Sequence, residues 1–320
     1  MVSKQQYTPT STSFKLALAQ NNLDWYLSQQ DLIRAEELGS HTHAVCNAIT
    51  PSSQENSLDL LRQLNEGQSH FLGSYVERLW RHYIESSPRY RLLAHNLQVY
   101  DQGKTLGEFD FIVRDETTGI TVHQEIAVKF YLGLPCPEQT QCLWFGPNNV
   151  DRLDKKAAHL ANKQLRLFEK AQARETLEKL GINKLTSECI LRGRLFLPWA
   201  DEIRHQCQML EGSTAHVPKD SWMTFSELTH YMDSRPEGTK YWLLEKHQWL
   251  SLYTHDQEPV PDEKLLSLLH RSVAEQHRGV MLKTMTQDPH SQGAIFVVPD
   301  LWQQTSYNSL ADSSEKPRHP

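Results

Sequence analysis

The alternation of apolar and polar residues first predicts a helix between residues 71 and 84. Apolar residues recur there in adjacent pairs every four positions, which indicates one buried stripe, and Ser86-Ser87-Pro88 marks the end of the helix. Three β-type runs follow, separated by short turns that contain glycine. They lie at 92–100, 106–114 and 120–132. These short connections predict two consecutive hairpins.

The next segments predict a crossover connection. Residues 151–180 have a helical pattern that stops at Gly181, and residues 189–197 form another β-type run. A strand that is reached from the same sheet through a helix is expected to lie parallel to its partner. The predicted order is therefore helix, three antiparallel strands, helix and strand, which defines an α/β core.

Weaker patterns flank this core on both sides. Helical spacing before it predicts a helical lead-in, and the polar ends of the chain predict disordered tails. After the core, the pattern predicts a linker and a small α+β extension, with a helix, a strand at 241–249, a helix at 262–276, and strands at 280–284 and 294–298. The expected boundaries are 1–12 (tail), 13–57 (lead-in), 58–204 (core domain), 205–222 (linker), 223–302 (extension) and 303–320 (tail).

Composition narrows the class of protein. The chain has 320 residues, of which 38% are hydrophobic, and this excludes wholesale disorder. No run approaches the roughly 20 apolar residues of a membrane helix, and the first residues contain no apolar targeting segment. We therefore expect a soluble, cytoplasmic protein without a membrane partner. The five cysteines are scattered without a CxxC pair, which predicts reduced thiols, and no HExxH, GxGxxG, GxxxxGK[ST] or GxSxG motif occurs.

Charge is distributed unevenly along the chain. The whole sequence has a net charge of −6, but residues 151–194 contain 11 Lys and Arg against six Asp and Glu, so this segment is +5 and the remainder is −11. Such a segment can form a local anion-binding face, and it can equally be a solvated helix of mixed charge.

Two of the predicted strands place acidic residues on one face. Strand side chains alternate, so Glu108 and Asp110 are expected on one side of the second strand, opposite Phe109 and Phe111. In the third strand, the same rule places Glu125, Ala127 and Lys129 together, opposite Ile126, Val128 and Phe130. If the two strands pair, carboxylates and a lysine converge.

Such a group of side chains suits metal-dependent phosphate chemistry. Carboxylate oxygens are the ligands that Mg²⁺ and Mn²⁺ prefer, and open water positions on such an ion suit phosphodiester hydrolysis. A nearby lysine can orient the attacking water or stabilise charge on the phosphate. The alternative is a solvent-facing strand surface on which Lys129 pairs with Glu125.

At these residues the chain resembles the PD-(D/E)XK nuclease superfamily and, more closely, the uncharacterised bacterial family called domain of unknown function 1853. The resemblance covers about residues 23–302. Its motifs are LDWYL at 23–27, LGSYVERLW at 72–80, EFDF at 108–111, EIAVKFYL at 125–132, and GP at 146–147 followed by DRLDKK at 151–156. It implies a restriction-endonuclease-like core and metal-dependent hydrolysis of nucleic acid.

The resemblance also implies roles for individual residues. Asp110 matches the central metal ligand, Glu125 the second acid and Lys129 the lysine of the motif. Glu77 matches a helical glutamate that binds the metal through water. Lys156 and Gln164 match a region of the following helix that faces the phosphate. With their basic neighbours on this helix they form the expected nucleic-acid-binding set of Lys155, Lys156, Lys163 and Gln164.

The spacing of the third-strand motif departs from the superfamily pattern. One residue normally separates acid and lysine, whereas three separate Glu125 from Lys129, so the acid stands about 6.8 Å further along the strand. Glu108 is the expected substitute ligand. Three hypotheses follow: a nuclease dependent on Mg²⁺ or Mn²⁺, a catalytically degenerate nuclease fold that binds nucleic acid or protein, and an interaction protein in which these charges form a structural network.

Overall fold

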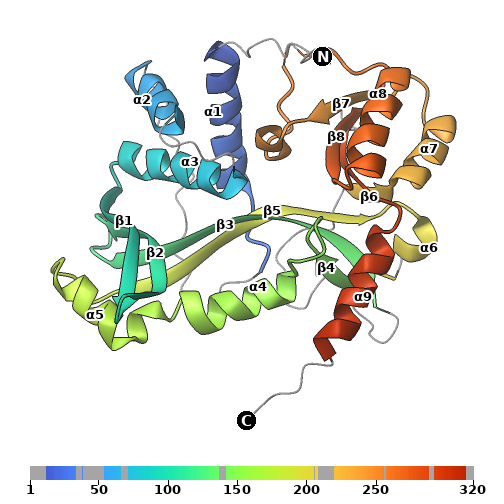
Figure 1. The fold of residues 1–320 in the computed structure, drawn as a ribbon. Coiled ribbons are helices and arrows are strands. Elements are labelled where there is room, and N and C mark those ends of the chain that lie inside the picture. Colours follow the sequence, from blue (N-terminus) through green and yellow to red (C-terminus); the bar gives the residue numbers. More distant parts are fainter. Residues whose placement is uncertain are drawn as a thin grey trace, which may run out of the picture.

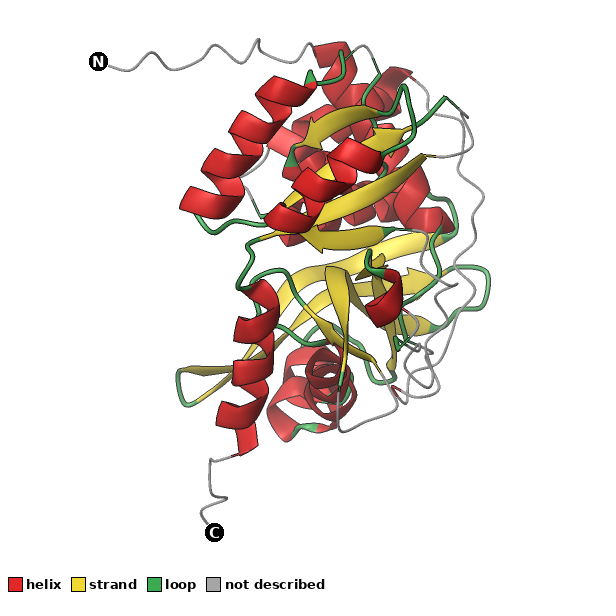
Figure 2. Ribbon diagram, turned by 90° about the vertical axis from the view of Figure 1, so that its right-hand side faces the viewer, coloured by secondary structure: helices red, strands yellow, loops and turns green. Residues whose placement is uncertain are grey.

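The computed structural model describes residues 12–33, 38, 54–65, 71–136, 142–204, 206–207, 220–255, 257–287 and 292–314. It is a mixed α/β structure around one large sheet, with helices on both sides of the strands (Figures 1 and 2). No helix in these ranges is long and apolar enough to cross a membrane. The expected first tail, apart from Thr12, lies outside the described residues.

The first half of the chain forms the expected helix and hairpins. Its elements are α1 (Thr12–Ser28), α2 (Gln54–Asn65), α3 (Leu72–Ser86), β1 (Tyr90–Asp101), β2 (Lys104–Asp115), β3 (Thr121–Pro135) and the short β4 (Cys142–Phe145). β1 pairs antiparallel with β2, and β2 pairs antiparallel with β3. Helix α3 buries the stripe that contains Tyr75, Leu79 and Tyr83. The hairpin prediction is therefore confirmed.

The predicted parallel pairing of the strand after the crossover is confirmed, but the connection is not one long helix. It consists of α4 (Leu153–His159), a π-helical turn at Leu160–Gln164, a 3₁₀ turn at Leu167–Glu169 and α5 (Ala171–Glu178), followed by β5 (Thr186–Pro198). The helix predicted at 151–180 breaks because Lys170 has an extended backbone, while Leu167 packs into the cluster under β1 and β2. β5 runs parallel to β3 over eleven residue pairs.

The second half continues the same sheet. It contains α6 (Asp201–Arg204), β6 (Ser221–Thr224), α7 (Phe225–Ser234), β7 (Lys240–Leu244), a 3₁₀ turn at Lys246–Trp249, α8 (Asp262–Leu269), a π-helical turn at His270–Glu275, β8 (Val280–Met285), β9 (Gln292–Val298) and α9 (Trp302–Ser314). The strand predicted at 241–249 is thus a shorter strand followed by a 3₁₀ turn. The sheet order is β1-β2-β3-β5-β6-β9-β8-β7, and β4 pairs with β3.

The sheet continues across the boundary that was expected between the core and the extension. β6 begins inside the predicted linker and joins β5 to β9 by parallel pairing on both sides. One hydrophobic cluster also contains residues of both halves, among them Trp80, Ile126 and Phe296. Parallel pairing between distant segments leaves no local signal in the sequence. Residues 205 and 208–219 of the predicted linker lie outside the described residues.

The last helix is a second correction. Residues 303–314 were expected in a disordered tail, but they belong to α9, which packs against the end of β3 and the loop after β4 (Figure 1). Trp302 Nε1 donates to Pro147 O at 2.9 Å, and Tyr307 Oη donates to Pro135 O at 2.7 Å. The helix is therefore held by tertiary contacts, which a polar segment does not reveal by periodicity.

Candidate functional site

The candidate site lies where β2 separates from β3. The two strands pair only from Phe111 to Arg114 on β2, and Asp110 is the residue directly before this pairing. Asp110 Oδ2 accepts a hydrogen bond from the backbone N–H of Ile126 at 3.0 Å. The carboxylate therefore satisfies an amide of β3 that β2 has ceased to pair.

The strand alternation predicted for β2 does not hold across Asp110. Phe109 packs with Ile112 in the cluster beside α5, whereas Phe111 and Val113 pack in the main core beneath α3. Phe109 and Phe111 were expected on the same face, and this expectation is wrong. The change of side occurs at Asp110, where pairing with β3 ends and the backbone is free to depart from regular alternation.

Glu125 approaches Asp110 from β3, and helix α4 and its extension hold it there. Gln164 Nε2 donates to Glu125 Oε1, and Gln164 Oε1 accepts from Lys156 Nζ at 2.9 Å. Gln164 lies in the π-helical turn that extends α4, a local distortion that is frequent at functional sites. The three side chains form a continuous chain from the helix to the strand.

Burial and like charge both act on this acid pair. Burial, and then repulsion from Asp110, raises the pKa of Glu125 to about 8. Burial also raises the pKa of Asp110 to about 6, although the hydrogen bond from the backbone of Ile126 lowers it. Lys156 is the cation that lowers the pKa of both carboxyl groups. Near pH 7 the neutral form of Glu125 is therefore favoured, whereas Asp110 is largely ionised, and a divalent cation would favour the ionised form of Glu125.

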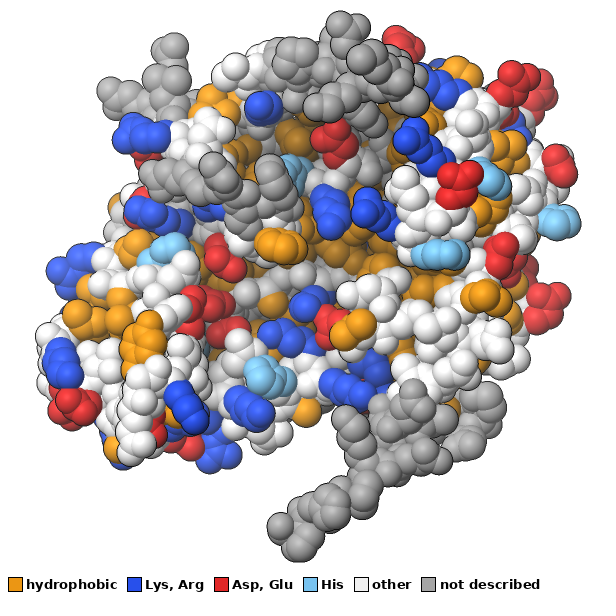
Figure 3. Space-filling model, in the orientation of Figure 1, with side chains coloured by type: hydrophobic (Ala, Val, Ile, Leu, Met, Phe, Trp, Pro, Cys, Tyr) orange, Lys and Arg blue, Asp and Glu red, His pale blue; other side chains and the backbone are white. Residues whose placement is uncertain are grey.

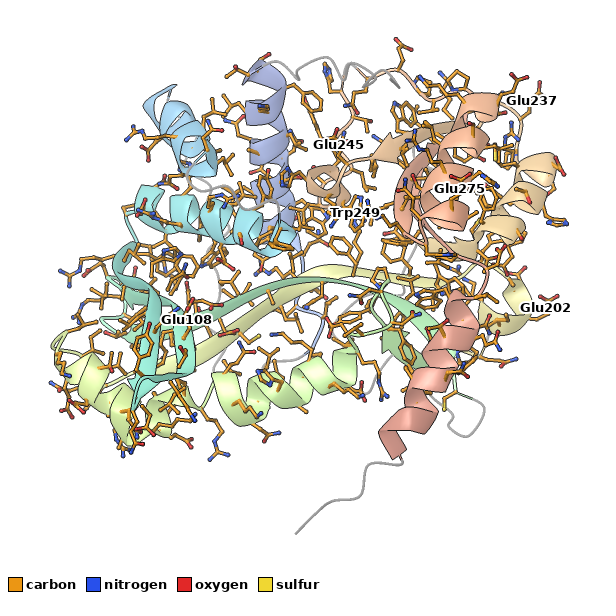
Figure 4. The ribbon with its side chains drawn as sticks, in the orientation of Figure 1. Glu108, Glu202, Glu237, Glu245, Trp249 and Glu275 are labelled. Atoms are coloured by element: carbon orange, nitrogen blue, oxygen red, sulfur yellow. The ribbon has the colours of Figure 1, made fainter. Side chains whose placement is uncertain are left out.

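Two further acids lie around the pair. Glu77 on α3 has a raised pKa, first because it is partly buried and then because of the negative charge of Glu108. Both residues also raise the pKa of Asp110 and of Glu125. Figure 4 shows Glu108 on β2, between α3 and the crossover helices. The four residues predicted as metal ligands therefore lie in one electrostatically connected region.

Lys129 lies elsewhere than the motif predicts. Its Nζ is 2.6 Å from Asp151 Oδ2, and Tyr131 Oη donates to the same oxygen at 3.3 Å. Sequence reasoning missed Asp151 as its partner, because Asp151 comes from a loop whose path the strand pattern does not predict. The cation at the acid pair is Lys156, from the helix, in place of the strand lysine.

A histidine that the sequence analysis did not select lies behind Glu125. The Nε2 atom of His123 is 3.7 Å from Glu125 Oε2, and neither atom has a hydrogen-bond partner within the described part of the chain. Burial lowers the pKa of His123 to about 3, so the imidazole is neutral. The unpartnered Glu125 Oε2 marks a carboxylate whose bonding capacity is not saturated by the protein.

The basic residues predicted on the crossover helix divide into two pairs. Lys156 and Gln164 are half-buried and face Glu125, whereas Lys155 and Lys163 are exposed. In Figure 3 this face of the molecule is hollowed across its middle, with Lys and Arg side chains along the hollow and acidic side chains gathered over β2. The first pair, Lys156 and Gln164, interacts with the acids, and the second pair is exposed to solvent.

Asp110 and Glu125 fit a divalent cation in part. Across the ranges that the structure describes, no three His, Cys, Asp or Glu residues form a ready metal-binding group. Mg²⁺, however, is commonly held by one or two carboxylates, with water and substrate phosphates completing its coordination. The unsaturated oxygen of Glu125 and the mutual repulsion of the pair suit such a cation.

Comparison with known proteins gives one match. The family model described as Domain of unknown function (DUF1853) matches residues 21–298, a range that contains every candidate site residue. Neither the comparison with curated proteins nor the comparison with solved structures found a match. Because this family model covers most of the chain, the chain belongs to the DUF1853 family.

Proposed function

We propose that this protein has a PD-(D/E)XK-like core and hydrolyses phosphodiester bonds of nucleic acid with Mg²⁺ or Mn²⁺. One observation carries the proposal: half-buried Asp110 and buried Glu125 lie where β2 leaves β3, Asp110 raises the pKa of Glu125, and Lys156 lowers the pKa of both. The order from α3 to β5 supports it, because helix, three antiparallel strands, helix and a parallel strand is the order that this superfamily implies.

The residues divide the work as follows. Asp110 and Glu125 would hold the cation, with Glu108 and Glu77 near enough to contribute through water. When bound, the ion would polarise the phosphate and lower the pKa of the attacking water. Gln164 positions the Glu125 carboxylate by hydrogen bonding, and Lys156 places positive charge beside the developing negative charge of the phosphate. Lys155 and Lys163 would contact the nucleic-acid backbone.

Calorimetric titration with Mg²⁺ and Mn²⁺ tests the metal site directly. Wild type should bind saturably, and Asp110→Asn should lose binding while remaining folded, because its amide oxygen still accepts from Ile126. Asp233→Asn is a matched control, since Asp233 is exposed on α7. Cleavage of single- and double-stranded DNA and RNA should then require the metal and fail in EDTA. Saturable binding that is equal in wild type and Asp110→Asn would contradict the proposal.

A second function is supported by the ion pair between Lys129 and Asp151. Because Asp151 pairs with the lysine of the motif, that lysine is not at the acid pair. The alternative proposal is therefore a catalytically degenerate site in a module that binds nucleic acid or protein. The double variant Lys155→Glu/Lys163→Glu should then abolish nucleic-acid binding, as measured by fluorescence anisotropy. Wild type should bind no metal and cleave nothing. Metal-dependent cleavage by wild type excludes this alternative.

A further inference from the structure

A cavity of about 680 Å³ lies at the far end of the sheet from the C-terminal strands. Its walls come from β1, the turn between β2 and β3, and the segment that joins α5 to β5. Gly119 and Gly181, with φ of 71° and 74°, make the turns in two of these walls. Both backbone conformations favour glycine, so the shape of the cavity is encoded locally.

The cavity is separate from the acid pair. Arg114 lines it and is four residues along β2 from Asp110, which corresponds to roughly 14 Å in an extended strand. None of the residues assigned to metal or nucleic acid above contributes to its lining. Its volume lies in the range of small-molecule sites, which is about 300 to 1,000 Å³.

The charged residues in the lining are all cationic. They are Arg91, Arg114 and Lys184. The carboxylate of Glu116 is outside the lining and lies 2.9 Å from Arg91 Nε and 3.8 Å from Arg114 Nε. One carboxylate against three cations leaves a charge of about +2 at the cavity, which favours a ligand with an acidic group.

Half of the remaining lining residues are aliphatic. Leu93, Ile182 and Leu185 contribute to it, and so do Ile120 and Leu180, which are 37% and 50% exposed. Ile120 and Leu180 thus offer apolar surface against which the body of a ligand could pack. The cations would recognise the acidic group of such a ligand, and the aliphatic residues would contact its body.

We infer that this cavity binds a small organic anion that combines an apolar body with one carboxylate or phosphate group. The inference does not depend on the proposed nuclease function. Two interactions make the recognition specific: charge-assisted hydrogen bonds from Arg91 and Arg114, and burial of the ligand body against Ile120 and Leu180. A bare anion lacks the second interaction, and a neutral apolar molecule lacks the first.

Calorimetric titration of the full chain with decanoate tests the inference, with decyl phosphate as a second probe. Wild type should bind either probe saturably, and inorganic phosphate at the same concentration should not compete. Arg114→Met and Leu180→Asp should each weaken binding at least tenfold, by removing the charge and the apolar wall respectively. Arg166→Met is the matched control, because Arg166 is exposed and paired with Glu169 outside the cavity.

The use of two variants separates the cavity from non-specific binding. Circular dichroism would verify that each variant is folded, and Leu180→Asp changes only an exposed residue after the end of α5. Preference for decanoate or for decyl phosphate would identify the acidic group. If neither probe binds wild type saturably, or if both variants bind like wild type, the inference is wrong.

Discussion

Two regions of this sheet bury charged side chains, and they treat them in opposite ways. At the junction of β5 with the C-terminal strands, Arg194 Nη1 bonds Asp220 Oδ2 at 2.9 Å, while its other nitrogens donate to Trp249 O and Leu250 O at 3.1 and 2.6 Å. Asp220 Oδ1 in turn accepts from the backbone N–H of Ala294 at 2.9 Å. Each charge at this junction has a partner of opposite charge and further hydrogen bonds.

At the separation of β2 from β3 the balance is reversed. Four acids, Asp110, Glu125, Glu77 and Glu108, act on one another, and Lys156 is the cation that moderates the inner pair. Glu125 Oε2 is buried and has no hydrogen-bond partner among the residues that the structure describes. A junction that serves structure is saturated, whereas this cluster costs the folded state free energy that a bound cation would recover. The contrast argues against the hypothesis of a purely structural charge network.

The largest expected effect is a loss of stability at the junction of β5 with the C-terminal strands. Arg194→Met should lower the free energy of unfolding by about 3 kcal/mol, because it leaves the Asp220 carboxylate buried without its cation. Urea denaturation measures the change. Arg166→Met, at an exposed ion pair with Glu169, should change it by less than about 0.5 kcal/mol. A loss at Arg194 no larger than at Arg166 would mean that the junction is not what holds β5 to the second half.

The second prediction concerns the acid pair, where a substitution should impair cleavage without lowering stability. Asp110→Asn should reduce metal-dependent cleavage by at least about a hundredfold, as expected on loss of a charged ligand. Its stability without metal should equal or exceed that of wild type, because one of two repelling carboxylates is removed. Initial cleavage rates and urea denaturation measure the two effects. Destabilisation by Asp110→Asn without loss of cleavage would make the acid pair structural.

The local sequence predicts the region around the acid pair better than it predicts the junction of β5 with the C-terminal strands. The helix, hairpins and crossover around Asp110 and Glu125 follow from local periodicity and glycine turns, and the coarse α/β order was predicted from them. The pairing of β6 with β5 and β9 depends on segments far apart in the chain and was not predicted. Likewise, the exchange of Lys129 for Lys156 at the acids depends on a loop that delivers Asp151, and no strand rule contains that information.

A third prediction uses pH to measure the cost of the acid pair. The folded-state pKa of Glu125 is raised to about 8, so between the unfolded pKa and pH 8 the folded protein binds more protons than the unfolded chain. Stability should therefore fall as pH rises, by about 1 to 2 kcal/mol from pH 6.5 to 8.5. His123, with a pKa lowered from 6.5 to about 3, contributes in the opposite direction mainly below this window.

Urea denaturation across this window measures the slope. Glu125→Gln should flatten it, because the amide is neutral throughout and its oxygen can still accept from Gln164. Saturating Mn²⁺ should also flatten or invert the slope in wild type, since the cation binds the ionised carboxylates. An unchanged slope in Glu125→Gln would assign the pH dependence to other groups.

The smallest expected effects distinguish two adjacent lysines on α4. Lys155 is exposed, and Lys155→Met should weaken nucleic-acid binding a few-fold and reduce its salt dependence by the equivalent of about one phosphate contact. Lys156 is half-buried against Gln164, and Lys156→Met should leave that salt dependence nearly unchanged. It should instead raise the pH at which metal binds, because the carboxyl groups lose the cation that lowers their pKa. Anisotropy titrations at several salt concentrations, and metal titrations at several pH values, separate the two roles.

If both variants change the same measurement to the same extent, the helix presents one uniform basic surface, and the distinction between a lysine for the polyanion and a lysine for the acid pair fails.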